Sequence, residues 1–318
     1  MNFIKLLFFI LISTLITANQ GLASLQENVS DFILKRCQYL ERFKNIPVCS
    51  TCVSSQTTIP NFYRERGYRP AWTKKSTINE LLDAIKDSYD HGLNPDDYHL
   101  KALQKLEEKI HKTGVTEPSL LADYDILLTD ALLRLSFHLF YGKVSPESLD
   151  PNWNFKRRLM DIEPHKYLSK VIRSGNIKES LKKLSPDAAY YNVLKRWLRK
   201  YREFAKNPWP LVPSGKTLKL GMKSHRIKIL KQRLIAEGFL SSHSNNITEI
   251  FDDSLFESVK AFQKHHGLSV DGVVGRDTLH ALNILPKDKI NQIRVNLERA
   301  RWLLHDLPRK FLLVNIAD

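Results

Sequence analysis

The chain has 318 residues, enough for about two domains on a prior of roughly 150 residues each. Hydrophobic residues make up 42% of it, which is ordinary for a globular protein and does not fit a chain without a sizeable core. The formal net charge of +15 is unusual and calls for an anionic partner or a strongly solvated surface.

The N-terminus has the pattern of an export signal. Lys5 is the only charged side chain before Glu27, and residues 6–16 are almost wholly apolar. Gly21 and Ala23 place small residues at both positions that a signal peptidase reads. We therefore expect residues 1–23 to be a signal peptide, cleaved after Ala23, and the mature protein to lie in the periplasm. The alternative is an uncleaved membrane anchor, but the apolar run is short for a span of about 20 residues.

The three cysteines, Cys37, Cys49 and Cys52, all lie near the N-terminus of the mature chain. Cys49 and Cys52 have the C-x-x-C spacing of redox motifs, but no strand–helix unit of thioredoxin type surrounds them. In an oxidising compartment a structural disulfide is the better interpretation. Three thiols leave one unpaired, and the spacing does not say which.

Residues 28–210 are predicted to be mostly helical. A helix is expected over residues 78–89, and Asn94 followed by Pro95 has the pattern of a helix N-cap and first position. The segment "DYDILLTDALLRLSFHLFYGK" is apolar nearly all round, as a central buried helix is, and Gly142 is expected to end it. Residues 185–206 form a further amphipathic helix with a basic outer face.

Most of the excess charge lies between Lys195 and Arg233, which hold 13 basic residues and one acid, Glu203. In an exported protein this charge points to the carboxylates of the cell wall or to anionic lipid, and not to nucleic acid. The alternative is a solvated helix face. Within this region "KNPWPLVPSGK", residues 206–216, has three prolines and a glycine and is predicted to be a linker.

Residues 216–285 are predicted to form three short helices. Ile227, Leu230 and Leu234 share one helix face, which Gly238 ends. Leu255, Val259 and Phe262 share a face of a second helix, which Gly267 ends. A tight turn at Asp271 and Gly272 precedes a third helix. About 70 residues with one small core is near the lower limit for independent folding.

Residues 286–318 are predicted to be a helix followed by one β-strand over residues 311–316. A single strand has no neighbour to pair its backbone groups, so we expect residues 309–318 to have no ladder partner. The predicted fold class is thus mainly α: a helical domain, a small three-helix domain, a terminal helix and an orphan strand.

Two blocks in the second region resemble the common three-helix peptidoglycan-binding domain. They are "SVKAFQKHHGL" (258–268) and "DGVVGRDTLHAL" (271–282), in this order and spacing. In the second block Gly272 is expected to allow a tight turn and Gly275 to let a helix begin. The two leucines of that helix, at positions 279 and 282, are expected to pack inward. The resemblance implies peptidoglycan as the partner and a motif made of Phe262, Gln263, Gly267, Asp271, Gly272, Gly275, Thr278 and Leu282.

The first region resembles the helical scaffold domain of large L,D-transpeptidases of the Gram-negative periplasm. The matching segments are "FYRERGYRPAWT" (62–73), "HGLNPDDYH" (91–99) and "LTDALLRLSFHLFYGKVSPESLDPNW" (128–153). In the third region "RVNLERARWL" (294–303) and the strand after it resemble the segment that leads into that family's catalytic domain. The resemblance implies four parts: a signal peptide (1–23), a scaffold domain (28–210), a peptidoglycan-binding domain (216–285), and a linker helix with the first strand of a missing catalytic domain (286–318).

The nucleophile of that family, a cysteine in a Ser-His-Gly-Cys context, is not in these 318 residues. No cysteine occurs after Cys52. A thiolate beside an imidazole is what acyl transfer from a stem peptide requires. The expectation is a truncated, wall-binding protein that is not an enzyme as given. One alternative is a transpeptidase whose catalytic domain is a separate chain or was lost by a frameshift. Another is a structural protein that adheres to anionic surfaces through residues 195–233.

Other groupings are weak candidates for chemistry. His91, Asp96, Asp97 and His99 lie close in sequence, but helix capping explains the acids, so no metal or cofactor is expected. His265 and His266 diverge on a helix and are not predicted to be ligands. Asp125 and Asp130 are five residues apart, which does not support a paired-carboxylate glycosidase with His138 nearby. The tryptophans are predicted to pack against helices, while stacking on sugar is left open for the one in the linker; they are Trp72, Trp153, Trp197, Trp209 and Trp302.

Overall fold

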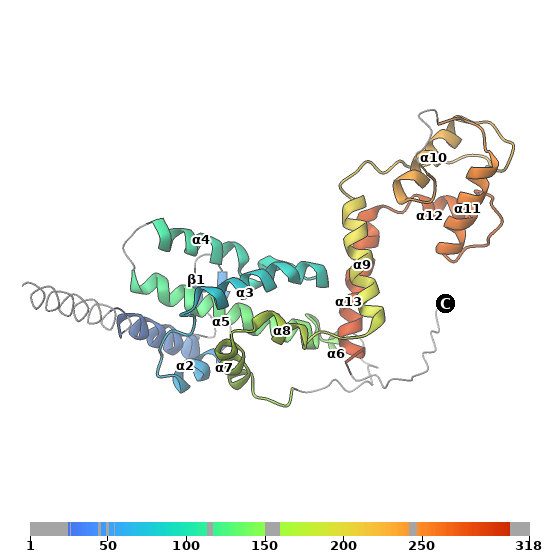
Figure 1. Cartoon of the computed structure of the whole chain (residues 1–318). Coiled ribbons are helices and arrows are strands. Elements are labelled where there is room, and N and C mark those ends of the chain that lie inside the picture. The colour runs from blue at the N-terminus through green and yellow to red at the C-terminus, as the bar shows by residue number, and fades with distance from the viewer. Residues whose placement is uncertain are drawn as a thin grey trace, which may run out of the picture. The chain divides into compact units, whose positions relative to one another are not determined.

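The computed structural model describes residues 25, 27–43, 46–48, 51–53, 55–112, 117–149, 160–241 and 247–305. These residues are mainly helical, as predicted, and divide into two compact units (Figure 1). The first unit holds the described residues up to Tyr191 together with those from Glu298 onward, and the second is Asn192–Leu297. None of the helices in this part of the chain is long and apolar enough to cross a membrane.

The first unit is a bundle of short helices around one long helix. A helix over residues 27–43 precedes the others. The long central helix is α5 (Pro118–Tyr141), and Gly142 ends it as predicted. Around it the chain forms α2 (Thr58–Glu65), α3 (Lys75–Asp87), η1 (Ser88–His91), η2 (Pro95–Tyr98), α4 (Leu100–Lys112), α6 (Pro146–Leu149), α7 (Pro164–Ser174) and α8 (Ile177–Lys182).

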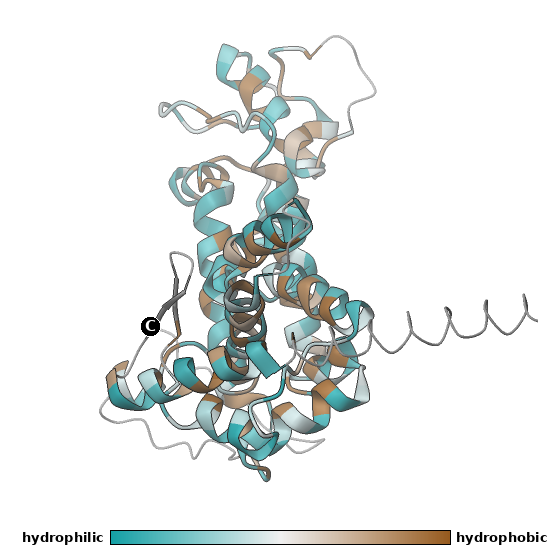
Figure 2. Ribbon diagram, turned by 90° about the vertical axis from the view of Figure 1, so that its left-hand side faces the viewer, coloured by the Kyte–Doolittle hydropathy of each residue, from teal (hydrophilic) through white to brown (hydrophobic). Residues whose placement is uncertain are grey.

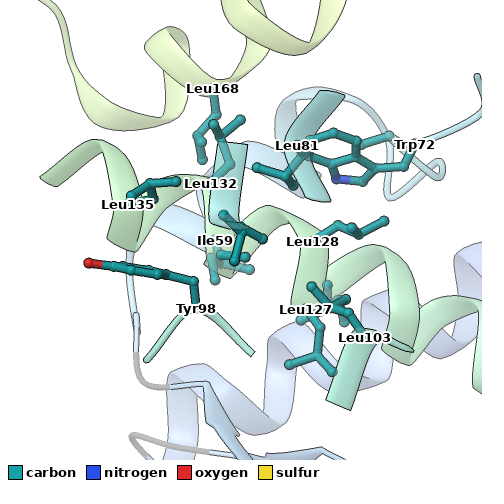
Figure 3. Packing of buried hydrophobic residues seen from close by; sticks show 14 of the residues in the cluster. Ile59, Trp72, Leu81, Tyr98, Leu103, Leu127, Leu128, Leu132, Leu135 and Leu168 are labelled. Carbon is teal, nitrogen blue, oxygen red and sulfur yellow. The ribbon is translucent and has the colours of Figure 1, made fainter. Parts of the chain in front are cut away.

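The core of this unit forms because α5 is apolar on nearly all sides. The helix packs against α2, α3, α4, α7 and α8. Figure 3 shows Leu127, Leu128 and Leu132 of α5 among side chains of the surrounding helices. The outer helices are amphipathic, so each carries an apolar and a hydrophilic stripe, as the colouring of Figure 2 shows. A buried Leu or Ile contributes about 1.5–3 kcal/mol relative to exposure, which makes this cluster the main stabilising element of the unit.

Asp125 fastens the loop after α2 to α5 through a buried polar network. Its carboxylate accepts hydrogen bonds from the Tyr63 hydroxyl (2.6 Å) and from the backbone N–H groups of Ala71 (3.0 Å) and Trp72 (2.9 Å). Trp72 Nε1 also donates to Thr129 Oγ1 at 3.0 Å. Burial raises the pKa of Asp125 in spite of these hydrogen bonds. The network accounts for the buried Trp72, which the sequence predicted to pack against a helix.

The end of α13 (Pro286–Leu303) completes the first unit through Arg301, which is only 2% exposed. Its guanidinium donates to the His91 carbonyl oxygen (2.9 Å), the Tyr191 hydroxyl (3.0 Å) and Glu298 Oε2 (2.6 Å). Glu298 Oε1 in turn accepts from the backbone N–H groups after α5, at Lys143 and Val144. Four segments distant in sequence therefore meet at one buried ion pair, the Arg301 cluster.

The strands of the described residues lie near the N-terminus. β1 (Ile46–Val48) and β2 (Thr51–Val53) pair antiparallel, with Pro47 opposite Cys52. This hairpin was not predicted, because residues 28–210 were interpreted as mostly helical. The predicted orphan strand at 311–316 lies outside the described residues.

The second unit contains α10 (His225–Glu237), α11 (Asp253–His265) and α12 (Arg276–Leu282), with most of α9 (Ala189–Phe204) and α13. The three predicted helices are confirmed, and Ile227, Leu230 and Leu234 are fully buried as their spacing indicated. Two isolated bridges, Leu218↔Val274 and Lys223↔Ile250, connect the segments between the helices.

The segment predicted to be a linker, residues 206–216, is packed onto this second unit. Val212 is 1% exposed, its N–H donates to Asn283 Oδ1, and its carbonyl accepts from Asn283 Nδ2, both at 2.9 Å. Trp209 Nε1 donates to the Ile284 carbonyl at 3.1 Å. Prolines remove backbone donors without preventing burial, which is why composition alone did not indicate this packing.

Replacing Arg301 with Met should destabilise the first unit strongly. The change keeps an apolar stem but leaves Glu298 and Tyr191 without their buried partner, and removal of one partner of a buried ion pair costs about 3 kcal/mol or more. Urea unfolding followed by circular dichroism measures the loss. The matched control is Arg299→Met, an exposed position on the same helix, expected within about 0.5 kcal/mol of the unchanged protein. Equal effects of the two substitutions would contradict the assigned role of Arg301.

Candidate functional site

The predicted peptidoglycan-binding motif converges on the side-chain amide of Gln263, which is 1% exposed. Gln263 Nε2 lies within hydrogen-bond distance of Asp271 Oδ1 (2.7 Å), the Val273 carbonyl (2.9 Å) and Thr278 Oγ1 (3.1 Å). Its Oε1 accepts from the Gly272 N–H at 2.8 Å. One amide therefore joins α11, the turn at 271–273 and α12.

The acid of the motif completes this turn. Asp271 Oδ1 also accepts from the Val273 N–H at 2.9 Å. The Val273 N–H, followed by the Gln263 amide, holds the pKa of Asp271 below its usual value. Asp271 is therefore an ionised turn residue whose acceptor atom is already engaged within the chain.

The glycines of the motif allow backbone conformations or close contacts that a side chain would disfavour. Gly272 has φ +72°, and a Cβ there would lie 2.2 Å from the ring of Phe256. Gly267 follows α11 with φ +67° and has open space around it. Gly275 is the N-cap of α12. The backbone at Gly272 and Gly267 thus lies in the left-handed region that favours glycine.

The remaining motif residues are core residues. Phe262 and Leu282 are fully buried and Thr278 is 5% exposed. The structure thus brings the predicted residues together as the frame of the module, with Asp271 and Gly267 exposed and most of the others buried. Further surface residues that could meet a wall polymer lie outside the motif.

The basic segment 195–233 divides into two classes of cation. Lys231 and Arg233 are buried and internally paired, with Asp252 and with Glu237. Most of the others are exposed, on α9 or between residues 216 and 228. The segment is therefore both a structural element and a cationic surface.

Arg233 is the centre of a buried ionic group in the second unit. It donates to the Leu282 carbonyl (2.7 Å) and to Glu237 Oε2 (2.7 Å), and its guanidinium lies 3.6 Å from the ring centre of Trp209. Tyr201 donates to Glu237 Oε1 at 3.1 Å. Burial alone raises the pKa of Glu237, but His266 and Arg233 outweigh it and lower the pKa to about 2. Trp209, left open as a sugar-stacking residue, has one ring face covered by this cation.

The other candidate groups have structural partners. Asn94 caps η2 as predicted, accepting from the Asp96 N–H at 3.3 Å. Asp97 pairs with Lys143 at 2.8 Å, and His99 with Asp130 at 2.6 Å. Asp130 also pairs with Arg134 at 2.5 Å. Within the described ranges no three His, Cys, Asp or Glu side chains gather as a metal site.

The remaining tryptophans and histidines are accounted for in the same way. The rings of His265 and Trp197 contact each other at a tilt of 48°, with ring centres 5.1 Å apart. Trp302 Nε1 lies 2.6 Å from the position that a Cβ on Gly142 would occupy, so this indole packs closely against the end of α5. Trp153 lies outside the described residues.

Cys37 is unpaired and 2% exposed in the scaffold core. Burial, with a smaller contribution from Glu41, raises the pKa of its thiol to about 12. A protonated, buried thiol is not a nucleophile. The side chains of Cys49 and Cys52 lie outside the described residues, so the predicted structural disulfide stays a prediction.

Comparison with known proteins matches the two regions to two families. Residues 57–198 match the scaffold domain, and residues 223–282 match the peptidoglycan binding domain. The chain thus combines a scaffold domain of the kind found in L,D-transpeptidases with a peptidoglycan-binding domain, and the predicted resemblance is confirmed. These two domains make it a cell-wall-associated protein.

Two curated proteins share part of the sequence. One is the N-acetylmuramoyl-L-alanine amidase CwlM of Mycobacterium tuberculosis, 37% identical over 82 residues, which are 24% of this chain and 20% of the amidase. Another is a probable CtpA-like serine protease of Staphylococcus saprophyticus, 34% identical over 80 residues, 25% of this chain and 16% of the protease. The chain spans a fifth or less of the length of either relative.

Gly272→Ala should destabilise the second unit more than Gly267→Ala does. Both positions have a positive φ, which costs a side chain about 1–2 kcal/mol. Only at Gly272 does the new Cβ also overlap an aromatic ring, and overpacking adds about 1–3 kcal/mol. Thermal unfolding of the two variants measures the difference. An equal loss in both would show that the Phe256 ring moves aside freely.

Cys37 should resist alkylation in the folded protein. At pH 8 a thiol with a pKa of about 12 has roughly 1000-fold less thiolate than an ordinary cysteine. Iodoacetamide treatment followed by peptide mass mapping should leave the Cys37 peptide unmodified, and prior unfolding in urea should make it react. Rapid labelling without urea would contradict the buried placement.

Proposed function

We propose that this protein is exported to the periplasm and binds peptidoglycan through residues 216–285, with the helical scaffold as its support. The observation that carries the proposal is the complete motif, assembled around one buried amide in a segment that matches a peptidoglycan-binding domain. The apolar N-terminus of residues 1–23 supports export. The cationic surface between residues 216 and 228 suits a wall whose peptides carry carboxylates.

These 318 residues are proposed to bind and not to catalyse. They contain no Ser-His-Gly-Cys, and Cys37, the one cysteine side chain that the structure describes, is buried and protonated. The second candidate is an L,D-transpeptidase whose catalytic domain is supplied by a separate chain, and the scaffold match favours it. Intact-mass spectrometry of this chain after treatment with a carbapenem, which traps the thiolate of that family, tests the first candidate. We expect no adduct, and a stable adduct on a cysteine of this chain would contradict the binding-only proposal.

The mature protein should co-sediment with purified Gram-negative sacculi. Its affinity should fall as salt rises, because exposed charges are screened over about 8 Å at physiological ionic strength. Deletion of residues 216–285 should abolish binding, with circular dichroism confirming that the scaffold remains helical. Retention of binding after this deletion would place the function elsewhere in the chain.

A further inference from the structure

A tight turn before α10 presents two lysines around an exposed leucine. The N–H of Met222 donates to the carbonyl of Lys219 at 3.2 Å, and Gly221 has φ +81°. Lys219 and Lys223 therefore stand at the two ends of one turn. Leu220, within the turn, is 46% exposed and so lies on the surface between the two lysines in sequence.

Backbone pairing fixes this turn to the rest of the module. The N–H of Gly221 donates to the Phe251 carbonyl (2.9 Å), and the N–H of Phe251 to the Met222 carbonyl (2.8 Å). Lys223 forms a bridge with Ile250, which is 49% exposed. Residues directly opposite in such a pair have Cβ atoms about 4.5–5.5 Å apart. Lys219, Leu220, Lys223 and Ile250 therefore form one ordered surface, the turn patch.

Some cations of the module are paired: Lys231 with Asp252, Arg233 with Glu237, and Lys260 with Glu257. Others on its surface, such as Lys228 and Lys264, form no ion pair among the described residues, and the two lysines of the turn patch belong to this second group. Among the described residues neither Lys219 nor Lys223 has an ion-pair partner. The nearest acid in sequence to Ile250 is Glu249, which is engaged by His225 Nδ1 at 3.0 Å. Two cations and two aliphatic side chains are thus available to a ligand.

We propose that the turn patch binds the peptide stems of the wall and not its glycan strands. This inference rests on the proposed function. The lysines complement the free carboxylates of a stem peptide, and Leu220 and Ile250 suit its small aliphatic side chains. Sugar rings usually stack on aromatic side chains, and the patch has none. An anionic lipid surface also offers negative charge, but membrane-surface binding needs a broader apolar face than two aliphatic residues.

The test compares two charge-reversed variants of the full mature chain in sacculus binding. Lys219→Glu with Lys223→Glu alters the patch. The matched control, Lys228→Glu with Lys264→Glu, changes the net charge equally at exposed positions on α10 and α11. At fixed salt the patch variant should lose at least about tenfold in affinity, and the control less than threefold. Sacculi whose carboxylates are amidated should bind the unchanged protein as weakly as intact sacculi bind the patch variant.

Competition identifies the ligand. Soluble stem peptides should displace the protein from sacculi, whereas peptide-free glycan strands should not. Equal losses in the two variants would reduce the effect to net charge and overturn the proposal, as would displacement by glycan alone. If the patch variant binds phosphatidylglycerol vesicles more weakly than the unchanged protein but binds sacculi equally well, the patch would be assigned to lipid and the proposal overturned. If the unchanged protein does not bind sacculi at all, the proposed function itself fails.

Discussion

The buried guanidinium of Arg301 is the interaction on which the architecture of the first unit depends. A charge that is 2% exposed needs polar partners, and those of Arg301 come from η1, from the start of α9 and from its own helix. Because the cluster joins residues near position 300 to residues before 192, the scaffold is discontinuous in sequence. The second unit, Asn192–Leu297, is therefore an insertion within it.

Inside that insertion the neutral side-chain amide of Gln263 joins separate segments, as the Arg301 guanidinium does in the first unit. Gln263 uses both ends of its amide to hold a turn between two helices, and this satisfies buried polar groups without a charge. Its neighbour Phe262 points into the core, while the turn patch lies on other segments of the module. The motif that identifies the module is thus separate from the surface proposed to bind the ligand. A sequence pattern reveals the motif because the fold tolerates few residue types at those positions. It says little about the surface that binds the ligand.

Local patterns predicted local structure well. The helical spacing of Ile227, Leu230 and Leu234 gave a buried face, and Asn94 and Gly142 marked helix ends, because these signals depend on neighbours within a few residues. The Arg301 cluster could not be predicted, since it joins residues up to 210 positions apart and Arg301 looks like any surface arginine of a helix. Val212 was missed for a related reason: its partner Asn283 lies 71 residues away, and the prolines on either side of Val212 suggested a linker. The motif residues of the binding module were grouped from sequence as a resemblance, whereas the burial of Phe262, Gln263 and Leu282 follows from tertiary packing.

The discontinuous scaffold has a consequence for the order in which the protein folds. A ribosome, or an export channel, delivers residues 1–191 well before Glu298 and Arg301. Until then the polar groups that the Arg301 cluster will join, among them the Tyr191 hydroxyl and the backbone after α5, are without their final partners. The last contacts of the first domain thus wait for the whole of the second to emerge. Early folding of the inserted module would shorten the flexible loop that these contacts must close and so reduce its entropic cost. Folding of the inserted module would then assist folding of the scaffold.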